Sequence, residues 1–278
     1  MTRAANELGV AQPSLSNSIR GLETELGVDL FDRHGRNVRL NSYGRAFLRH
    51  VERAFSALDD GRKELHDISS TRQSEIAVSS AALGWAVGLF TAFSEKRPDV
   101  RFRLFQRSTG EMTKQLGRSE VDLCLMIDVA LEAIQWTPLV SGEIYAMLPP
   151  GHRLTGRSTV SMAELRGEPL VVPRTGIPVR DLIEACLSAE GFVPNIVCEC
   201  DEMSTMGGLV RAGLGLQFIP DLGRDLSTNS DPSIVRISSP DCVLRIGMAW
   251  PRSGYRSSAA KDFSEFALAY FETKRQDR

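Results

Sequence analysis

The chain has 278 residues, 42% of them hydrophobic and 24% charged, which is enough to bury sizeable cores in two or three compact units. No apolar run approaches the roughly 18 residues of a membrane span, and the opening stretch MTRAANELGV has no apolar block typical of a secretion signal. Five cysteines, an odd number, argue against a disulfide scaffold. We therefore expect a cytoplasmic protein with free thiols and no membrane partner.

The arginines are unevenly placed, although the formal net charge is only −2. Between residues 33 and 53, six arginines stand against one acidic residue, Glu52, whereas acidic residues outnumber basic ones after residue 72. A local excess of arginine favours binding to nucleic-acid phosphates. The sequence therefore predicts a DNA contact in the N-terminal part of the chain.

The first 40 residues show the pattern of two short helices and a hairpin. A helix over residues 4–8 ends at Gly9, and a second begins at Gln12-Pro13-Ser14, where proline suits the first helical turn. Its apolar stripe is Leu15, Ile19, Leu22 and Leu26, and its other faces carry Ser14, Ser16, Asn17 and Arg20. After Gly27, residues 30–40 alternate apolar and basic residues around a glycine, which predicts a small basic β-hairpin wing.

A long helical pattern begins at Asn41, a suitable N-cap, and runs to about Ile68. Its apolar positions repeat with the 4-3 spacing of a heptad seam, which is typical of a dimerisation helix. The same spacing also fits an amphipathic helix that lies on its own domain, but the position between two domains favours dimerisation. The seam residues are Phe47, Val51, Ala54, Leu58, Gly61, Leu65 and Ile68.

Strands and helices alternate after residue 74, which predicts two similar α/β lobes. The first set comprises strands over 75–80, 100–106 and 121–127, with helices over 82–96 and 110–118. The second comprises strands over 169–173, 196–201 and 214–220, with helices over 179–190 and 204–212. A final strand over 243–250 and a helix over 257–274 are expected to return to the first lobe.

Nearly the whole chain resembles the LysR-type transcriptional regulators. The motifs that carry the resemblance are Arg3-Ala4-Ala5, Gln12-Pro13-Ser14-Leu15-Ser16, Leu26-Gly27, Leu30-Phe31, Gly35-Arg36, FSEKRPDV at 93–100, Val121-Asp122-Leu123, and Ala212-Gly213-Leu214-Gly215 with Ile219-Pro220. The resemblance implies an α/β protein with an N-terminal all-α winged helix-turn-helix and a two-lobed effector domain like a periplasmic binding protein. It also implies dimers that pair into tetramers, a small-molecule inducer, promoter DNA as partner, and RNA polymerase as a further candidate partner.

The expected domains are a winged helix-turn-helix over 1–41, a linker helix over 42–72 and an effector domain over 73–278. Within the last, we expect one lobe over 73–148 and 243–278 and another over 149–242. The family usually has a further helix before the residues seen here, so the apolar faces of Leu8, Leu15, Ile19 and Leu22 are expected to lack a packing partner. Either the natural chain starts earlier, or DNA binding is weakened. The family also often has serine at Ala11, and arginine or glutamine at Asn17.

The hydrogen-bonding groups in the DNA grooves indicate which side chains of this segment are suited to contact DNA. Gln12 and Asn17 can each make paired hydrogen bonds to adenine in the major groove. Serines and Arg20 suit phosphates, and arginines on the wing suit a narrow minor groove. The predicted DNA-binding residues are Gln12, Pro13, Ser14, Ser16, Asn17, Arg20, Arg33, Arg36 and Arg39.

The resemblance also implies an effector cleft at the loops between the two lobes. Helix N-termini there favour anions, and Arg174 is the only cationic candidate at the cleft. A carboxylate inducer is what the resemblance implies. Serine and threonine before a helix are equally suited to be structural N-caps. The predicted effector-binding residues are Ser80, Ala81, Ala82, Ser108, Thr109, Asp128, Arg174, Thr175, Gly176, Met203 and Ser204.

Other functional classes fit the sequence less well. No hydrolase, zinc-protease or P-loop motif occurs, so we expect neither an enzyme nor a cofactor. Cys198 and Cys200 lack a second ligand pair nearby in sequence, which argues against a metal site, but they leave a redox-sensing regulator as an alternative. A transport solute-binding protein would share the two-lobed fold, but it would be exported and would not carry the DNA-binding arm.

Overall fold

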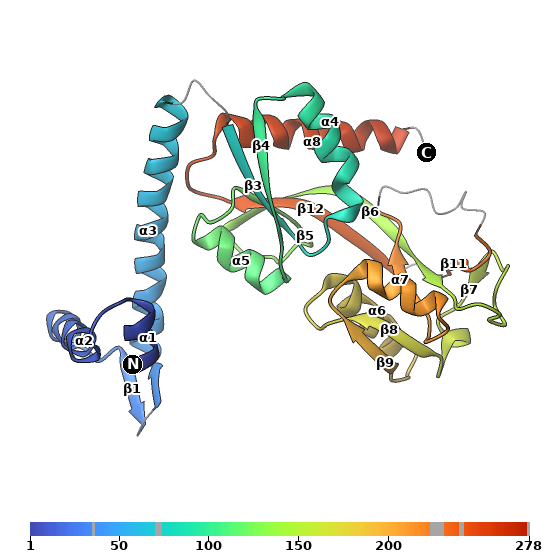
Figure 1. The fold of residues 1–278 in the computed structure, drawn as a ribbon, viewed down its shortest axis with the longest axis horizontal. Helices are drawn as coiled ribbons and strands as arrows, with labels where there is room; N and C mark the ends of the chain where they lie inside the picture. Colours follow the sequence, from blue (N-terminus) through green and yellow to red (C-terminus); the bar gives the residue numbers. More distant parts are fainter. Residues whose placement is uncertain (35–36, 70–73, 223–230, 239–241, 277–278) are drawn as a thin grey trace. The chain divides into compact units, whose positions relative to one another are not determined.

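A computed structural model of the chain describes residues 1–34, 37–69, 74–222, 231–238 and 242–276 (Figure 1). It divides into two compact units, Met1–Asp59 and Asp60–Arg278. Helix α3, Ser42–Ser69, is continuous across the boundary between them. Within the described residues, no helix combines the length and the apolar character needed to cross a bilayer.

The N-terminal unit holds two short helices, a hairpin and the beginning of α3. Its elements before α3 are α1 (Thr2–Glu7), α2 (Gln12–Leu26), β1 (Phe31–His34) and β2 (Asn37–Leu40). Pro13 lies in the first turn of α2, and Gly27 ends the helix in the left-handed conformation with φ +69°. Strands β1 and β2 pair antiparallel with Phe31 opposite Leu40, which confirms the predicted hairpin. Residues 35 and 36 of its turn lie outside the described residues.

A side-chain cap and one close backbone approach fix the beginning of α3. Asn41 caps the helix, because its Oδ1 accepts the N–H of Gly44 at 2.9 Å. A Cβ atom on Gly44 would lie 2.1 Å from the carbonyl oxygen of Leu30, so only glycine fits at this position. The predicted N-cap is therefore confirmed. Of the apolar residues expected to lack a partner, Leu8 is 65% exposed and Leu22 36% exposed, whereas Leu15 and Ile19 are half-buried.

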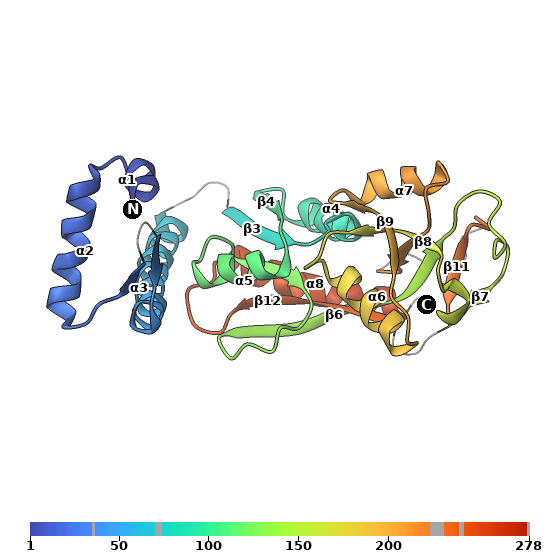
Figure 2. The same ribbon diagram turned by 90° about the horizontal axis from the view of Figure 1, so that it is seen from below.

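The second unit is built on one curled sheet and one small sheet, with helices on their faces (Figure 2). Its strands are β3 (Ser74–Ser80), β4 (Val100–Gln106), β5 (Leu123–Met126), β6 (Ile134–Met147), β7 (Thr159–Val160), β8 (Pro169–Pro173), β9 (Asn195–Cys200), β10 (Gln217–Pro220), β11 (Ile234–Ile237) and β12 (Val243–Pro251). Its α-helices are α4 (Val87–Lys96), α5 (Thr109–Gly117), α6 (Pro178–Ala189), α7 (Met203–Arg211) and α8 (Ser258–Gln276), and short 3-10 turns are η1 (Gly84–Ala86) and η2 (Ala163–Leu165).

The first lobe is a sheet with helices on both faces. Its strand order is β4-β3-β5-β12, with β3 parallel to β4 and β5. Side chains alternate between the faces of β3, so that Ile76 and Val78 pack on the side of α4 and α8, and Ala77 packs with Met112 of α5. Phe93 and Phe263 join α4 to α8 through an edge-to-face contact with ring centroids 5.1 Å apart. The C-terminal helix thus returns to the first lobe.

The second lobe has the parallel pair β8 and β9 between α6 and α7. Val171 of β8 packs with Met206 and Val210 of α7, whereas Val172 faces Ile183 of α6. The sequence predicted that β10 would be the third strand of the sheet that holds β8 and β9. Instead, β10 pairs antiparallel with β6, and only an isolated bridge from Leu216 to Leu170 joins this segment to β8.

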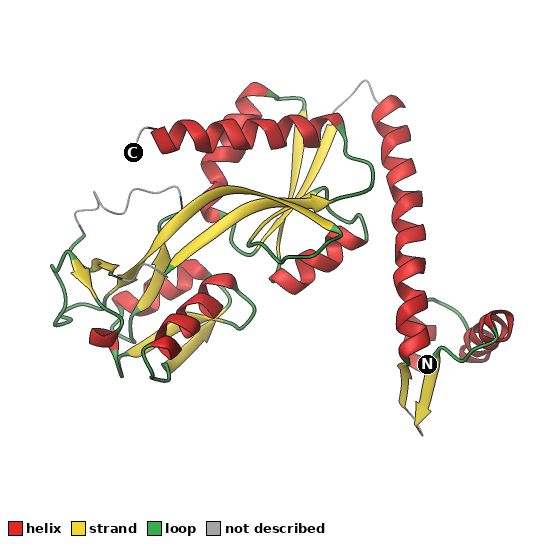
Figure 3. Cartoon of the chain, turned by 180° about the vertical axis from the view of Figure 1, so that it is seen from behind, coloured by secondary structure: helices red, strands yellow, loops and turns green. Residues whose placement is uncertain are grey.

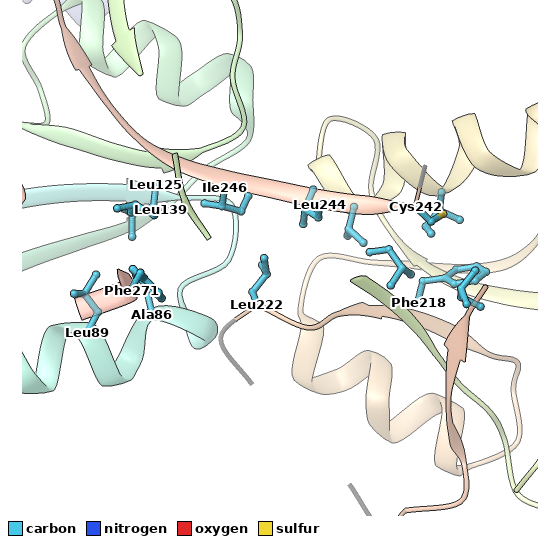
Figure 4. Packing of buried hydrophobic residues seen from close by; sticks show 14 of the residues in the cluster. Ala86, Leu89, Leu125, Leu139, Phe218, Leu222, Cys242, Leu244, Ile246 and Phe271 are labelled. Carbon is cyan, nitrogen blue, oxygen red and sulfur yellow. The ribbon is translucent and has the colours of Figure 1, made fainter. Parts of the chain in front are cut away.

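The long strands β6 and β12 connect the two lobes (Figure 3). They pair along most of their length, after which β6 continues into ladders with β10 and β11. The buried side chains follow the same path, as Figure 4 shows from Ile246 and Leu244 of β12 to Cys242, which directly precedes that strand. One apolar cluster therefore runs through both lobes and supports the loops at their facing ends.

Candidate DNA-binding and effector sites

Helix α2 presents a polar surface at its N-terminal end. Gln12, Ser14, Asn17 and Arg20 are exposed, and Ser16 is half-buried. The N-cap residue is Ala11, whose side chain cannot accept a hydrogen bond, so the first-turn N–H groups are not capped by it. Uncapped N–H groups at a helix N-terminus favour an anion such as a phosphate.

The wing and the beginning of α3 supply cations in the same unit. Arg39 is exposed and lies opposite Asp32 in the hairpin. The side chains of Arg33 and Arg36, which the sequence predicted to contact DNA, lie outside the described residues. Arg45 and Arg49 are exposed on α3, and Arg45 donates to the carbonyl oxygen of Leu40 at 2.7 Å.

A hollow of about 1010 Å³ lies beside α2. Its lining carries three carboxylates, Glu23, Asp29 and Asp32, against one cation, Arg20. An excess of carboxylates repels phosphate, so this hollow is unsuited to the DNA backbone. The exposed N-terminal turns of α2 are the better candidate surface.

The apolar side chains of the predicted seam are more exposed toward the C-terminal end of α3. Phe47 and Val51 are half-buried, whereas Ala54 is exposed. Leu58 and Leu65 are 63% and 67% exposed, and Ile68 is 77% exposed. Large apolar side chains at this spacing form an apolar stripe suited to a partner helix.

On the first lobe, the predicted effector residues are engaged in local hydrogen bonds. Ser80 is buried at the end of β3, and its Oγ lies 3.0 Å from the carbonyl oxygens of both Ala82 and Leu125. Ser108 caps α5 and shares a capping box with Glu111. Asp128 Oδ1 accepts the N–H of Ala130 at 2.9 Å. Each of these three side chains thus stabilises the conformation of its own loop through local hydrogen bonds, as a structural cap does.

The second lobe brings its predicted loop to the first. A Cβ atom on Gly176 would lie 4.0 Å from the Cβ of Ser108, so the two loops face each other at contact distance. Arg174, beside Gly176, pairs with Asp201 at 3.1 Å. Hydrogen bonds from Ser108, and then the charges of Arg174 and Arg107, hold the pKa of Glu111 below its ordinary value. The carboxylate of Glu111 therefore stays ionised close to Arg174.

The remaining predicted residues border the same region. Ala81, Ala82 and Thr109 are half-buried, and Thr175 is exposed. The backbones of Met203 and Ser204 begin α7, but their side chains lie outside the described residues.

Sequence reasoning missed Arg180, which is only 4% exposed. Its Nη1 donates to the carbonyl oxygen of Pro173 at 2.9 Å and to Glu199 at 3.1 Å, and its Nε donates to Glu184 at 2.6 Å. Burial lowers the pKa of this guanidinium, but the bonds to Glu184 and Glu199 outweigh that effect and raise it. Arg180 thus holds the end of β8, from which the Arg174–Gly176 loop departs. The i, i+4 spacing of Arg180 and Glu184 was the available signal.

Cys198 and Cys200 lie on β9 and are half-buried. Both pack against the small cluster that contains Met147, Val171 and Met206. Apolar contacts of this kind favour a structural role for the two thiols. Among the described residues, no three His, Cys, Asp or Glu side chains gather as a metal site would require.

The helix-turn-helix unit and the two-lobed α/β unit together define a DNA-binding regulator with an effector-binding domain. The family described as "LysR substrate binding domain" matches residues 71–272, and the one described as "Bacterial regulatory helix-turn-helix protein, lysR family" matches residues 1–45. The chain belongs to the LysR family of transcriptional regulators. Members of this family are regulators rather than enzymes, and they bind promoter DNA and small effectors as oligomers.

Individual relatives agree with this assignment. The chain is 33% identical over 276 residues to the uncharacterized HTH-type transcriptional regulator YybE of Bacillus subtilis, covering 98% of this chain and 94% of YybE. Full-length OxyR from Pseudomonas aeruginosa, in a variant form, has a similar fold with a TM-score of 0.66 and 22% identity over 96% of this chain and 88% of that one. The effector-binding domain of QuiR, solved with shikimate, gives a TM-score of 0.63 and 22% identity over 72% of this chain and 98% of that one.

Proposed function

We propose that this regulator binds promoter DNA through the exposed face of α2 and the hairpin wing, and that a small molecule between the two lobes modulates the binding. The observation that carries the DNA proposal is the exposure of Gln12, Asn17 and Arg20 on one short helix whose first turn has uncapped N–H groups. Gln12 and Asn17 would read bases, and Ser14, Ser16 and Arg20 would contact phosphates. The wing arginines 33, 36 and 39 would lie at the minor groove.

In this proposal each part of the chain has a main task, and exposed arginines at the beginning of α3 add contacts to DNA phosphates. Residues 1–41 bind DNA, residues 42–72 dimerise, and residues 73–278 bind the effector. The exposed stripe of Leu58, Leu65 and Ile68 supports a homodimer, with tetramers as the assembled form. RNA polymerase would be a further partner of the bound regulator, and the cytoplasm is the compartment in which it would act.

The DNA proposal is tested with the fragment upstream of the protein's own gene and a scrambled fragment of equal length. Gln12→Ala should relax base preference, since a paired hydrogen bond to adenine contributes about 1–3 kcal/mol of discrimination. Arg49→Ala should weaken binding to both fragments alike and lower the salt slope by about one. Equal losses on both fragments for both variants would contradict these roles, and equal affinity of the wild type for both fragments would overturn the proposal.

We propose that the inducer is a small carboxylate, which Arg174 binds where the Arg174–Gly176 loop faces Ser108. The approach of Gly176 to Ser108 means that Arg174 lies near the boundary between the lobes, and an incoming carboxylate would replace Asp201 as its exposed partner. Shikimate, the molecule solved with QuiR, is a suitable first probe in a thermal-shift screen of small carboxylates. A probe that raises the melting temperature should change the promoter footprint, and Arg174→Ala should abolish both effects. A hit that leaves the footprint unchanged would contradict the coupling.

A further inference from the structure

We propose that the ion pair between Lys63 of α3 and Asp122 of the first lobe is a coupling joint, which transmits movement of the effector loops to the linker helix. The inference rests on the proposed function, since it gives that function a path from the effector site to the helix that leads to the DNA-binding unit. All the contacts that carry it lie within the unit Asp60–Arg278.

Lys63 connects α3 to the start of β5. Its Nζ donates to the carbonyl oxygen of Ser119 at 2.8 Å and to Asp122 Oδ1 at 3.1 Å. The side chain of Asp122 is only 12% exposed and that of Lys63 35% exposed, so water screens this pair less than an ordinary surface pair. One turn earlier on α3, Asp60 Oδ2 accepts the N–H of Tyr255 at 3.2 Å. Two charged residues on one side of the helix thus hold it to the lobe.

Asp122 also holds the central strand of the lobe. Its Oδ2 accepts the N–H of Ala77 at 2.7 Å, and its own N–H donates to the carbonyl oxygen of Ala77 at 2.9 Å. One carboxylate therefore binds Lys63 with one oxygen and β3 with the other. A shift of β3 along its own direction must move the carboxylate, and the carboxylate must then move or release Lys63.

Three elements that meet at this joint lead to the predicted effector loops. Strand β3 continues from Ala77 to Ser80, a rise of about 10 Å at the spacing of an extended chain. Strand β5 begins just after Asp122 and leads to Asp128. Helix α5 begins after Ser108 and leads to Ser119, which is held at φ +53°, a conformation that a residue with a side chain rarely adopts.

A second cation, Arg256, lies beside the joint. The guanidinium of Arg256 stacks over Trp250 at 4.3 Å and donates to the carbonyl oxygen of Ala260. Among the described residues, its buried Nε has no hydrogen-bond partner. A cavity of about 10 Å³ is lined by Arg256, Lys63 and Asp122 together with Asp60 and Tyr255. This cavity is no larger than about one water molecule, so the carboxylate of Asp122 stays in contact with Lys63, and close packing carries a displacement of β3 to α3.

The test uses the full chain and requires no effector. In Ser108→Cys/Gly176→Cys, oxidation should join the lobes, because the two Cβ positions lie 4.0 Å apart, within the range of a disulfide. A side chain at residue 176 is strained at φ +83°, but this strain is common to the oxidised and reduced forms that are compared. Hydrogen exchange of residues 60–68 is then compared in the oxidised and reduced forms. We expect oxidation to change their exchange rate at least about threefold, as sub-global opening rates respond to small changes in local stability. Mass spectrometry of a peptide pair joined between residues 108 and 176 shows that this disulfide, rather than one between natural thiols, has formed.

The joint is then broken in the same background. Lys63→Met and Asp122→Asn should each make exchange in 60–68 insensitive to oxidation, and the double variant should add nothing further, since both remove one interaction. Asp122→Asn keeps an oxygen for Ala77, so exchange of the Ala77 amide should stay slow. Arg103→Met, which breaks an exposed pair with Glu75 between β3 and β4, is the matched control and should leave the oxidation response intact.

Two outcomes would overturn the coupling joint. In the first, oxidation leaves exchange in 60–68 unchanged although Lys63 and Asp122 are present. In the second, the same response persists in Lys63→Met. Neither result depends on DNA, so failure of the joint is distinguishable from failure of the proposed function, which is judged by the choice between promoter and scrambled fragments.

Discussion

Glu23 of α2 holds the chain where it enters the hairpin, because its Oε1 accepts the N–H of Leu30 at 2.9 Å. The same oxygen lies 3.3 Å from the N–H of Phe31. The side chain of Glu23 is buried, with only 7% of its surface exposed. The leucines of the same helix are all more exposed than Glu23. A buried carboxylate that satisfies strand N–H groups thus positions the wing relative to α2.

Replacing Glu23 should destabilise the N-terminal unit. Glu23→Ala leaves the N–H of Leu30 without its acceptor, and a buried unsatisfied group costs about 1–3 kcal/mol. Glu23→Gln keeps one carbonyl oxygen and should lose less. Chemical unfolding of the full chain, followed by a probe in the N-terminal unit, measures both. Equal stability of Glu23→Ala and wild type would show that the hydrogen bond contributes nothing.

Gly44→Ala should displace the beginning of α3. A Cβ at this position would lie 2.1 Å from the carbonyl oxygen of Leu30, which forces the helix and the hairpin apart. We expect a loss of about 2–4 kcal/mol, typical of a backbone clash in a packed site. Gly21→Ala in α2 is the matched control, because nothing lies within 4 Å of its Cβ position. That control should gain about 0.5–1 kcal/mol from better helix propensity.

Arg180 should matter for stability far more than Arg174. Arg180→Met leaves the buried carbonyl oxygen of Pro173 without its donor, which costs about 1–3 kcal/mol. The half-exposed carboxylates of Glu184 and Glu199, in contrast, can be solvated by water. Arg174→Ala removes a pair whose side chains are 52% and 73% exposed, so its effect should be at most about 0.5 kcal/mol. Urea midpoints of the two variants provide the comparison. Similar losses would argue against the buried role of Arg180.

Cys124 should resist thiol reagents while Cys198 and Cys200 react. Burial raises the pKa of the Cys124 thiol well above its ordinary value of 9.0, so the folded chain holds no reactive thiolate there at pH 8. Mass spectrometry after brief alkylation should find label on the two half-buried thiols of β9 first. Full labelling of all five cysteines in guanidinium is the control. Early labelling of Cys124 would show that its site opens readily.

The same pKa shift predicts a pH dependence of stability. Because the folded pKa of Cys124 is raised, its thiol stays protonated in the native chain while the unfolded chain ionises above pH 9. The contribution of this site is thus complete below pH 9 and is lost as pH rises further. The stability difference between wild type and Cys124→Ala should narrow above pH 9. A constant difference from pH 7 to 11 would contradict the shift.

Much of the secondary structure was predictable because it depends on local pattern. The strands at Val100–Gln106 and Pro169–Pro173 have the predicted bounds, and the capped beginning of α3 follows from Asn41. Strand β6, in contrast, was missed. It contains Pro138 and Gly142, which read as strand breakers in isolation. Pro138 is tolerated beside a register shift in β12, whose pairing residues lie about a hundred positions later in the chain.

The sequence by itself determined the family, the helix-turn-helix with its wing, the long linker helix and the α/β character of the rest, because motif, capping and periodicity act over a few neighbouring residues. Only the tertiary structure decided that Glu23 is buried, that Gly176 meets Ser108, and that Asp122 binds both Lys63 and Ala77. Those relationships join residues on separate elements. The packing of the whole chain sets them, and no local pattern encodes them.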